Sequence, residues 1–244
     1  MRTGIYIDFD NIASNGLGSM VYPALRKHYE GCGRVTQLHA YLSYDEGAES
    51  SNERFAAWRR GCRARMEQAG FMLHLKTPKS YQGPDGEVTT KANVDVDLTV
   101  DVLLHSERLD RVVLISGDGD FLRLVQALQD KGIWVDVAAY QGVSGELARA
   151  CNQLTNPLLI PGVHYSPEYS FKRVFRVTGF NMREMAMSIE YLRDSPTTLS
   201  PDDPAWVREE IRASREMYES RRFTPGRILG WTGADGLSAY HDIA

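Results

Sequence analysis

Aspartates cluster in three short segments of the sequence, 8–11, 91–101 and 116–121, and two of these segments directly follow apolar runs. Carboxylates that are brought together repel one another and raise each other's pKa unless a cation offsets the repulsion. A hard divalent cation such as Mg²⁺ or Mn²⁺ binds carboxylate oxygens and needs no His or Cys. Such an ion activates water and stabilises the charge that develops on a phosphate, so the pattern indicates phosphate-ester hydrolysis.

The elements that must position these acids alternate between strand-like and helix-like patterns. Strands are expected at 4–9, 35–44, 71–75, 112–115 and 133–139, with a last one at 158–160, and helices at 19–30, 52–68, 94–105, 121–131 and 145–150. Residues 79–87 are rich in turn formers and predict a loop. This order predicts an α/β fold, with a parallel sheet covered by helices on both faces. Sites in such sheets form beyond the carboxyl ends of the strands, where Asp8 and Asp118 are expected.

The sequence pattern changes after residue 162. Met182, Met185, Ile189 and Leu192 recur at helical spacing, and a second stripe runs from Val207 to Tyr218. We therefore expect an α/β domain over residues 1–162 and a mainly helical C-terminal extension over 163–244. The sequence does not assign a role to the extension; a homo-oligomer, substrate selection or docking to a protein partner would each fit it.

Composition excludes several classes of protein. The chain has 244 residues, 43% of them hydrophobic, which argues against a disordered chain or a fibre. Its three cysteines form no CxxC pair, and no apolar run is long enough to span a bilayer, so we expect a soluble, cytoplasmic protein without a membrane segment. The 28 basic and 32 acidic residues leave a net charge of −4, so a nucleic acid would have to be held by a local basic patch.

The strongest local basic cluster lies in the expected helix 52–68. Three of its arginines recur at helical spacing: Arg59, Arg60 and Arg63. They could bind a phosphate backbone, with Phe55 or Trp58 as a stacking group. The alternative is a solvated helix face balanced by nearby glutamates, with both aromatic side chains in the core.

Taken together, the three acidic segments resemble the NYN domain, in the LabA-like branch of the PIN and flap-nuclease-like proteins. The motifs are Asp-x-Asp-Asn after a strand, Lys-x-x-Val-Asp-x-x-Leu-x-x-Asp on a helix, and Ser-Gly-Asp-Gly-Asp-Phe after a strand. They span residues 8–121, and the order of elements extends the resemblance to about residue 160. It implies a PIN-like, Rossmannoid domain and a metal-dependent endoribonuclease that uses Mg²⁺ or Mn²⁺ on single-stranded or structured RNA.

The resemblance also implies the site. Its catalytic and metal-holding positions match Asp8, Asp95, Asp118 and Asp120. Its supporting positions match Asn11 and Asp101, and the side chains of Asp10, Ser116 and Lys91 beside them are further supporting candidates. Asp10 is a departure, because it is a second acid inside the first motif, and it could reach the metal or point away. Lys91 could meet a phosphate or pair with a nearby aspartate. On a straight helix, Asp95 lies about 240° from Asp101 at roughly 100° per residue, so the helix acids do not all face one ion.

Three alternatives stay open. Asp8 or Asp120 could simply cap a helix. Asp8-Phe9-Asp10 also resembles a haloacid-dehalogenase-type phosphatase with Asp8 as the nucleophile, although Ile12 departs from that family's pattern and the helix motif has no role there. The domain could also be a non-catalytic NYN-like module that binds nucleic acid or protein, although such a module has no need of clustered carboxylates.

Overall fold

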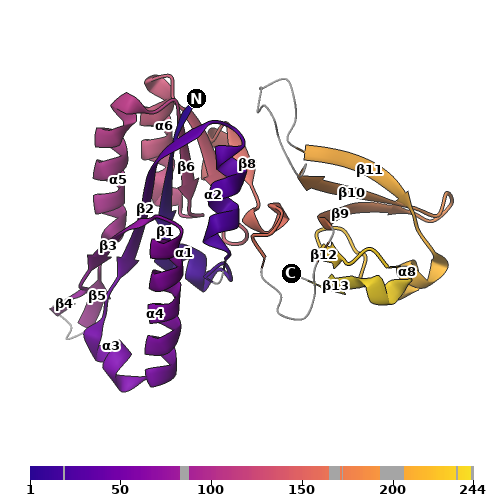
Figure 1. The fold of residues 1–244 in the computed structure, drawn as a ribbon, viewed down its shortest axis with the longest axis horizontal. Coiled ribbons are helices and arrows are strands. Elements are labelled where there is room, and N and C mark those ends of the chain that lie inside the picture. Colours follow the sequence, from indigo (N-terminus) through magenta and orange to yellow (C-terminus); the bar gives the residue numbers. More distant parts are fainter. Residues whose placement is uncertain are drawn as a thin grey trace.

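The computed structural model describes residues 1–18, 20–82, 88–164, 171, 173–192, 206–234 and 236–242, with the backbone alone at 80–82, 88–91, 192 and 206. Figure 1 shows an α/β part, which the N-terminal two thirds of the chain forms, beside a smaller part made of C-terminal strands. Within the described residues, no helix is long and apolar enough to cross a membrane.

The α/β part is built on one six-stranded sheet in which every neighbouring pair of strands is parallel. The strand order is β3-β2-β1-β6-β7-β8. The bounds are β1 Arg2–Asp8, β2 Arg34–Ser43, β3 Met72–Lys76, β6 Arg111–Ile115, β7 Trp134–Ala138 and β8 Gln153–Thr155. Strands β1 and β6 are apolar and buried along nearly their whole length, as expected of central strands covered on both faces.

Helices cover both faces of this sheet, which confirms the predicted fold class. The helices are α1 Phe9–Ser14, α2 Tyr22–Glu30, α3 Glu46–Ser51, α4 Glu53–Gln68, α5 Val94–His105, α6 Leu122–Asp130 and α7 Gly145–Ala150, with 3₁₀ turns η1 Ser106–Arg108, η2 Gly119–Phe121 and η3 Pro157–Leu159. Apolar side chains of α2 and α4 form one core with the sheet, and those of α5, α6 and α7 form the other.

Two local predictions in this part were wrong. The segment expected as a strand at 158–160 belongs largely to η3, because Pro157 has no N–H to donate to a strand ladder. The last strand is β8, a few residues earlier. The segment 79–87 was expected as a loop, but its described residues include β4 Lys79–Gln82, which pairs antiparallel with β5 Val88–Lys91.

The expectation of a mainly helical extension over 163–244 was also wrong. This part forms a five-stranded antiparallel sheet in the order β11-β10-β9-β12-β13. The bounds are β9 Arg173–Asn181, β10 Ala186–Leu192, β11 Trp206–Arg212, β12 Ile228–Trp231 and β13 Tyr240–Asp242, together with the short helix α8 Arg215–Glu219 and the 3₁₀ turn η4 Leu237–Ala239.

The spacing of the apolar residues explains this error. Met187 and Ile189 are buried at a period of two, which is the strand period. Met182 is exposed between β9 and β10, and Met185 has a positive φ of 50° in the same turn. The apparent helical stripe therefore mixed turn residues with strand residues. The C-terminal antiparallel sheet packs on the α/β part through Val174 of β9 and Ile228 of β12.

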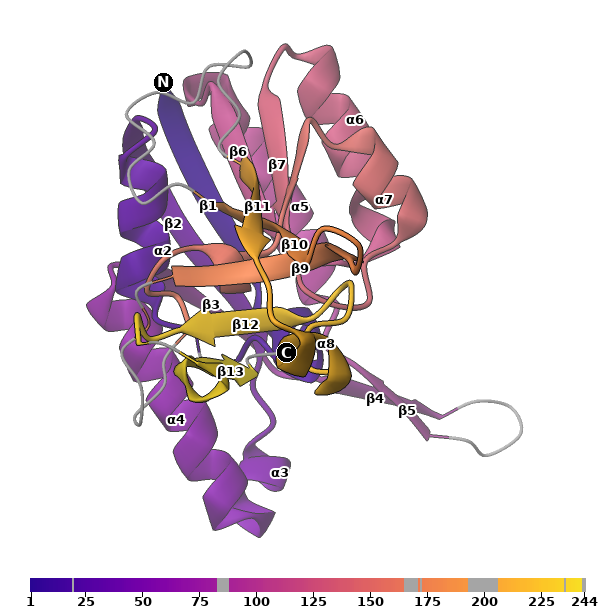
Figure 2. The ribbon, with the colours of Figure 1, turned by 90° about the vertical axis from the view of Figure 1, so that its right-hand side faces the viewer.

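The carboxyl edge of the parallel sheet is where the acidic segments meet. Strands β1 and β6 end there at Asp8 and Ile115, and α5 begins beside it. Figure 2 shows α3, the start of α4 and the β4–β5 hairpin projecting beyond this edge in different directions. Helices α3 and α4 and the β4–β5 hairpin therefore flank the carboxyl edge and extend beyond it.

Candidate active site

Asp8 is the last residue of β1 and is almost fully buried, with 6% of its surface exposed. The Ser116 hydroxyl donates a hydrogen bond to Asp8 Oδ2 over 2.8 Å. The Asn11 N–H donates to Asp8 Oδ1 over 3.3 Å, so the carboxylate also caps α1. Asp8 therefore does cap a helix, as one of the alternative interpretations expected. Capping alone does not explain why the carboxylate is buried, because a capping side chain does not need to be buried.

Ser116 joins Asp8 to Asp118. The Asp118 N–H donates to the Ser116 hydroxyl oxygen over 3.1 Å, and the Gly117 N–H donates to Asn11 Oδ1 over 3.0 Å. The end of β1, helix α1 and the loop after β6 are therefore joined by side chains that the sequence analysis had singled out. Asp120 donates its N–H to Asp118 Oδ1 over 3.0 Å, while its own carboxylate is exposed.

The glycines beside Asp118 serve close packing. Neither Gly117 nor Gly119 has a positive φ, so a sharp left-handed turn is not what they provide. A Cβ on Gly117 would lie 3.0 Å from the Gly142 carbonyl oxygen, and one on Gly119 would lie 2.9 Å from Ser144 Oγ. The Asp118 loop is thus held by close contact with the loop that follows β7.

Burial raises the pKa of Asp8 to about 6. The hydrogen bonds from Ser116 and Asn11 oppose this shift, and the neighbouring charges of Asp10 and Asp118 add to it. The carboxylate is therefore kept at an energetic cost near neutral pH. A group tuned in this way, at the carboxyl edge of a parallel sheet, is typical of functional sites.

Asp95 lies in the first turn of α5. It precedes Leu98 and Val102 by three and seven residues, and both of these are fully buried against the sheet. Asp95 therefore belongs to the stripe of α5 that faces the sheet, at the level of the carboxyl edge. No hydrogen bond or ion pair joins its carboxylate to the other acids within the described residues.

Lys76, which sequence reasoning did not assign to the site, anchors the start of α5. Its Nζ lies 2.7 Å from Asp97 Oδ2 and donates to the Asn93 carbonyl oxygen over 3.1 Å. Asn93 itself takes a left-handed conformation, with φ 46°, directly before the helix. Lys76 thus fixes the turn that carries Asp95, and the pairing depends on contacts between β3 and α5 that no local motif encodes.

Two of the expected supporting acids are engaged elsewhere. Asp101 accepts a hydrogen bond of 2.8 Å from the Tyr41 hydroxyl and lies 3.7 Å from His74 Nδ1. Asp10 forms an ion pair of 2.6 Å with Arg59 and accepts a 2.6 Å hydrogen bond from the Ser43 N–H. Asp10 therefore points toward α4 and the end of β2.

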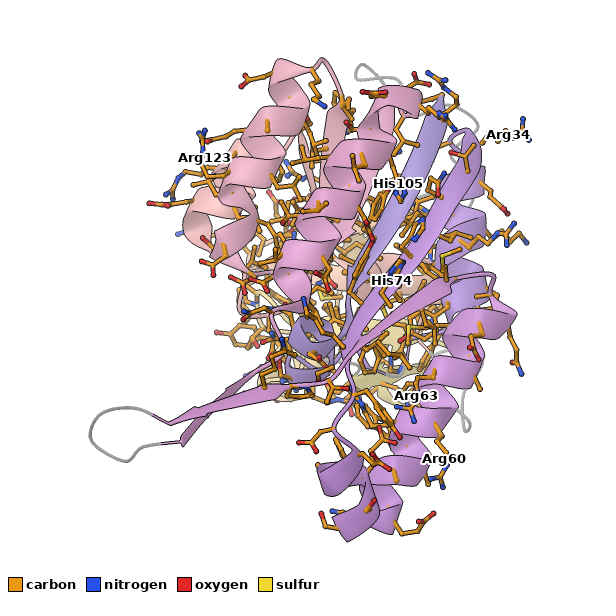
Figure 3. All side chains as sticks on the ribbon, turned by 90° about the vertical axis from the view of Figure 1, so that its left-hand side faces the viewer. Arg34, Arg60, Arg63, His74, His105 and Arg123 are labelled. Atoms are coloured by element: carbon orange, nitrogen blue, oxygen red, sulfur yellow. The ribbon has the colours of Figure 1, made fainter. Side chains whose placement is uncertain are left out.

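The three expected nucleic-acid-binding arginines each have a carboxylate partner. Arg59 is buried on Asp10, Arg60 pairs with Glu53 over 2.7 Å, and Arg63 binds Glu49 through two hydrogen bonds of 2.6 and 2.8 Å. Figure 3 shows Arg60 and Arg63 along α4. The side chain of Lys91 lies outside the described part of the structure.

The donor set at this edge suits a hard cation. Asp8, Asp118 and Asp95 offer carboxylate oxygens, Asn11 offers an amide oxygen, and His and Cys are missing from this set. The like charges around Asp8 are what such a cation would offset. Within the described residues, no three His, Cys, Asp or Glu side chains already converge closely enough to hold an ion.

The six-stranded parallel sheet with helices on both faces is consistent with the PIN-like α/β fold, and the buried Asp8 carboxylate lies at the carboxyl edge of this sheet. The model of the NYN domain family matches residues 2–159, more than half of the chain, and the chain belongs to this nuclease-related family.

Two relatives are similar to parts of the chain. The low amplitude and bright protein LabA of Synechococcus elongatus is 29% identical over 97 residues, which are 38% of this chain and 52% of that protein. The match thus spans about half of that relative's length. A crystal structure of a protein of unknown function from Vibrio parahaemolyticus is 25% identical, with a TM-score of 0.47, and the match covers 63% of this chain and 91% of that one.

Proposed function

We propose that this protein is a metal-dependent ribonuclease whose active site is the acidic carboxyl edge of the sheet. Asp8, Asp95 and Asp118 hold Mg²⁺ or Mn²⁺, and Asp120 completes the set of ligands or orients a water. The observation that carries the proposal is the buried Asp8 carboxylate, which shares Ser116 with Asp118 and has a pKa raised to about 6.

The chain's own residues supply order at this site. Ser116 and Asn11 fix the Asp8 carboxylate, and Lys76 fixes the start of α5 that carries Asp95. A bound divalent cation would supply Lewis acidity toward the phosphate and a lower pKa for the attacking water. Asp120 is exposed next to this edge, so its carboxylate can rotate toward a water molecule near the bound substrate. RNA as the substrate is supported by the membership of the NYN family.

Asp10 has a supporting structural role in this proposal. Its ion pair with Arg59 leaves it unsuited to the acid/base role that a haloacid-dehalogenase-type phosphatase would require. The NYN family match likewise favours a nuclease over that phosphatase.

The test is cleavage of a mixed pool of labelled RNA and single-stranded DNA in Mg²⁺, in Mn²⁺ and in EDTA. We expect wild type to cut RNA only with metal, and Asp118→Asn to lose this activity. Asp130→Asn, an exposed acid at the end of α6, is the matched control and should cut like wild type. Metal binding without cleavage under every condition would contradict the nuclease and favour a binding module.

A further inference from the structure

Two cavities lie beside the acidic edge and share one wall, Trp58. The first, of about 500 Å³, is lined by residues of α1, the end of β2, α3 and α4, among them Asp10, Ser43, Phe55, Trp58 and Arg59. The second, of about 460 Å³, lies on the other side of Trp58 and is lined by Met20, Val21, Tyr22, Pro23, Arg65 and Gln68. Together they form a surface that begins at Asp10, two residues after Asp8 in the sequence, and follows α4.

The aromatic side chains on this surface are partly open to solvent. Phe55 is 38% and Trp58 36% exposed, so neither is the core residue that the alternative sequence interpretation required. Trp58 is held in place from beneath by the buried Phe9, at a ring-centre distance of 5.9 Å. Phe55 lies beside it at 6.1 Å. A Cβ on Gly18 would come within 2.8 Å of Trp58 Cζ2, so the indole is also fixed at its edge.

Most of the charged side chains that line this surface are paired with one another, and Arg65 is available to an anionic chain. Of the acids that line the first cavity, Asp10 pairs with Arg59 and Glu49 pairs with Arg63, while Asp45 caps α3 by accepting a hydrogen bond from the Ala48 N–H. At the far cavity, Arg65 is exposed and donates to Cys62 Sγ over 3.1 Å. Among the described residues it has no carboxylate partner. A phosphate there would therefore meet a cation that no acid already occupies.

We propose that Phe55 and Trp58 form a base-stacking platform for single-stranded nucleic acid, with the strand running from the acidic edge along α4 to Arg65. The ten residue steps from Phe55 to Arg65 span about 15 Å of helix, long enough to follow a strand for more than one nucleotide. A preformed aromatic face binds any unpaired base, whereas paired bases hide their faces in the duplex stack. This inference rests on the proposed function and names the form of its substrate.

The experiment measures binding in EDTA, where no cleavage occurs. The probes are a fluorescently labelled oligouridylate of about 12 nucleotides, an abasic strand of the same length, and a blunt RNA duplex. We expect Trp58→Ala to weaken binding of the oligouridylate about 5- to 150-fold and Trp58→Phe to weaken it less. Binding of the abasic strand should stay within about 2-fold of wild type, because it has no base to stack. Tyr218→Ala, at an exposed tyrosine of α8, is the matched control.

The arginine is tested through salt dependence. Arg65→Ala should reduce the slope of log affinity against log salt by about 1 for both single strands. Phe55→Ala adds a variant at a more exposed position, so a folding failure of Trp58→Ala would still leave the platform testable. Tryptophan fluorescence gives an independent readout. A base that stacks on the Trp58 indole should quench the part of the emission that is present in wild type and missing in Trp58→Phe.

Several results would overturn the platform. These are unchanged oligouridylate binding in Phe55→Ala and Trp58→Phe, an equal loss for the abasic strand, tighter binding of the duplex, or no binding of single strands by wild type. The failure of the nuclease proposal looks different. In that case single strands bind in a Trp58-dependent manner, but no metal produces cleavage that Asp118→Asn abolishes.

Discussion

Arg59 Nη1 lies 2.6 Å from Asp10 Oδ1, and the Arg59 side chain is buried at this contact. A second guanidinium nitrogen donates to the Ser43 carbonyl oxygen. These contacts thus connect α4 to α1 and to the end of β2. The ion pair also explains both the extra acid in the first motif and one arginine of the basic cluster, because each is the partner of the other.

Removing this arginine should destabilise the fold. Arg59→Ala leaves Asp10 and the Ser43 carbonyl without their charged donor, so we expect the free energy of unfolding to fall by about 1–3 kcal/mol. Arg60→Ala removes an exposed ion pair and should cost no more than about 0.5 kcal/mol. Urea unfolding of both variants measures the difference. Equal losses would mean that the Arg59 pair contributes no more than a surface contact.

Asp8 should make stability depend on pH in metal-free buffer. Its pKa is raised to about 6, above the unfolded value of 3.8, so its stabilising contribution is present at low pH and is lost as the pH rises through 6. The ionised carboxylate then costs up to about 3 kcal/mol. Asp8→Asn should therefore be more stable than wild type at pH 8 in EDTA.

The control for this prediction is the same comparison at pH 4.5, where the advantage of Asp8→Asn should shrink. Asp130→Asn should show neither effect. If Asp8→Asn were less stable by the same amount at both pH values, the hydrogen bonds that Asp8 accepts would outweigh its desolvation.

A histidine cluster under α5 should make the protein sensitive to acid. His39 Nδ1 lies 2.9 Å from His74 Nε2, and the His39 ring stacks on Tyr6 at 5.4 Å and on His105 at 4.8 Å. Figure 3 shows His74 and His105 on the side of the sheet that α5 covers. Burial, and then the charges of His105 and His74, lower the pKa of His39 to about 4, while Asp101 opposes the shift.

The sign of this effect follows from the pKa. Unfolded His39 titrates near 6.5, so between pH 6.5 and 4 the unfolded chain binds more protons and stability falls as the pH falls. The loss from this residue is limited to about 3 kcal/mol. His39→Phe keeps the ring and removes the titration, so its stability should change less than that of wild type between pH 7 and 4.5. Parallel pH profiles for the two proteins, measured by urea unfolding, would refute this role.

The buried ion pair between Arg111 and Asp136 should be the most sensitive polar contact in the α/β part. Both side chains are essentially unexposed, and Arg111 Nη2 lies 2.8 Å from Asp136 Oδ2. Tyr29 and Thr155 also donate to this carboxylate. Arg111→Met leaves a buried carboxylate without its cation, so we expect a loss of about 3–5 kcal/mol.

The double variant Arg111→Met with Asp136→Leu tests the origin of that loss. It removes both charges, and much of the lost stability should return, because the penalty is the unpaired charge. Thermal unfolding of both variants measures this recovery. A double variant as unstable as the single one would assign the loss to packing around Tyr29.

The α/β part could be predicted well because its elements are encoded locally. Buried parallel strands are continuous apolar runs, and the residues that follow them lie at one edge whatever the details of packing. This is why Asp8, Asn11, Ser116 and Asp118 could be expected together, and the structure joins them by hydrogen bonds. The C-terminal sheet failed as a prediction because its apolar residues fit both periods, and only pairing between distant strands selects one of them.

The sequence by itself determined the order of β1, β2, β3, β6 and β7, the main helices between them, and the acids that follow the central strands. Tertiary structure decided what each charged side chain faces. Asp10 shares a motif with Asp8, and Asp101 shares one with Asp95. In the structure, however, Asp10 pairs with Arg59, and Asp101 accepts a hydrogen bond from Tyr41. Those partners lie 49 and 60 residues away along the chain. The physical reason is that an ion pair or a buried hydrogen bond depends on distance in space, and folding alone brings such residues together.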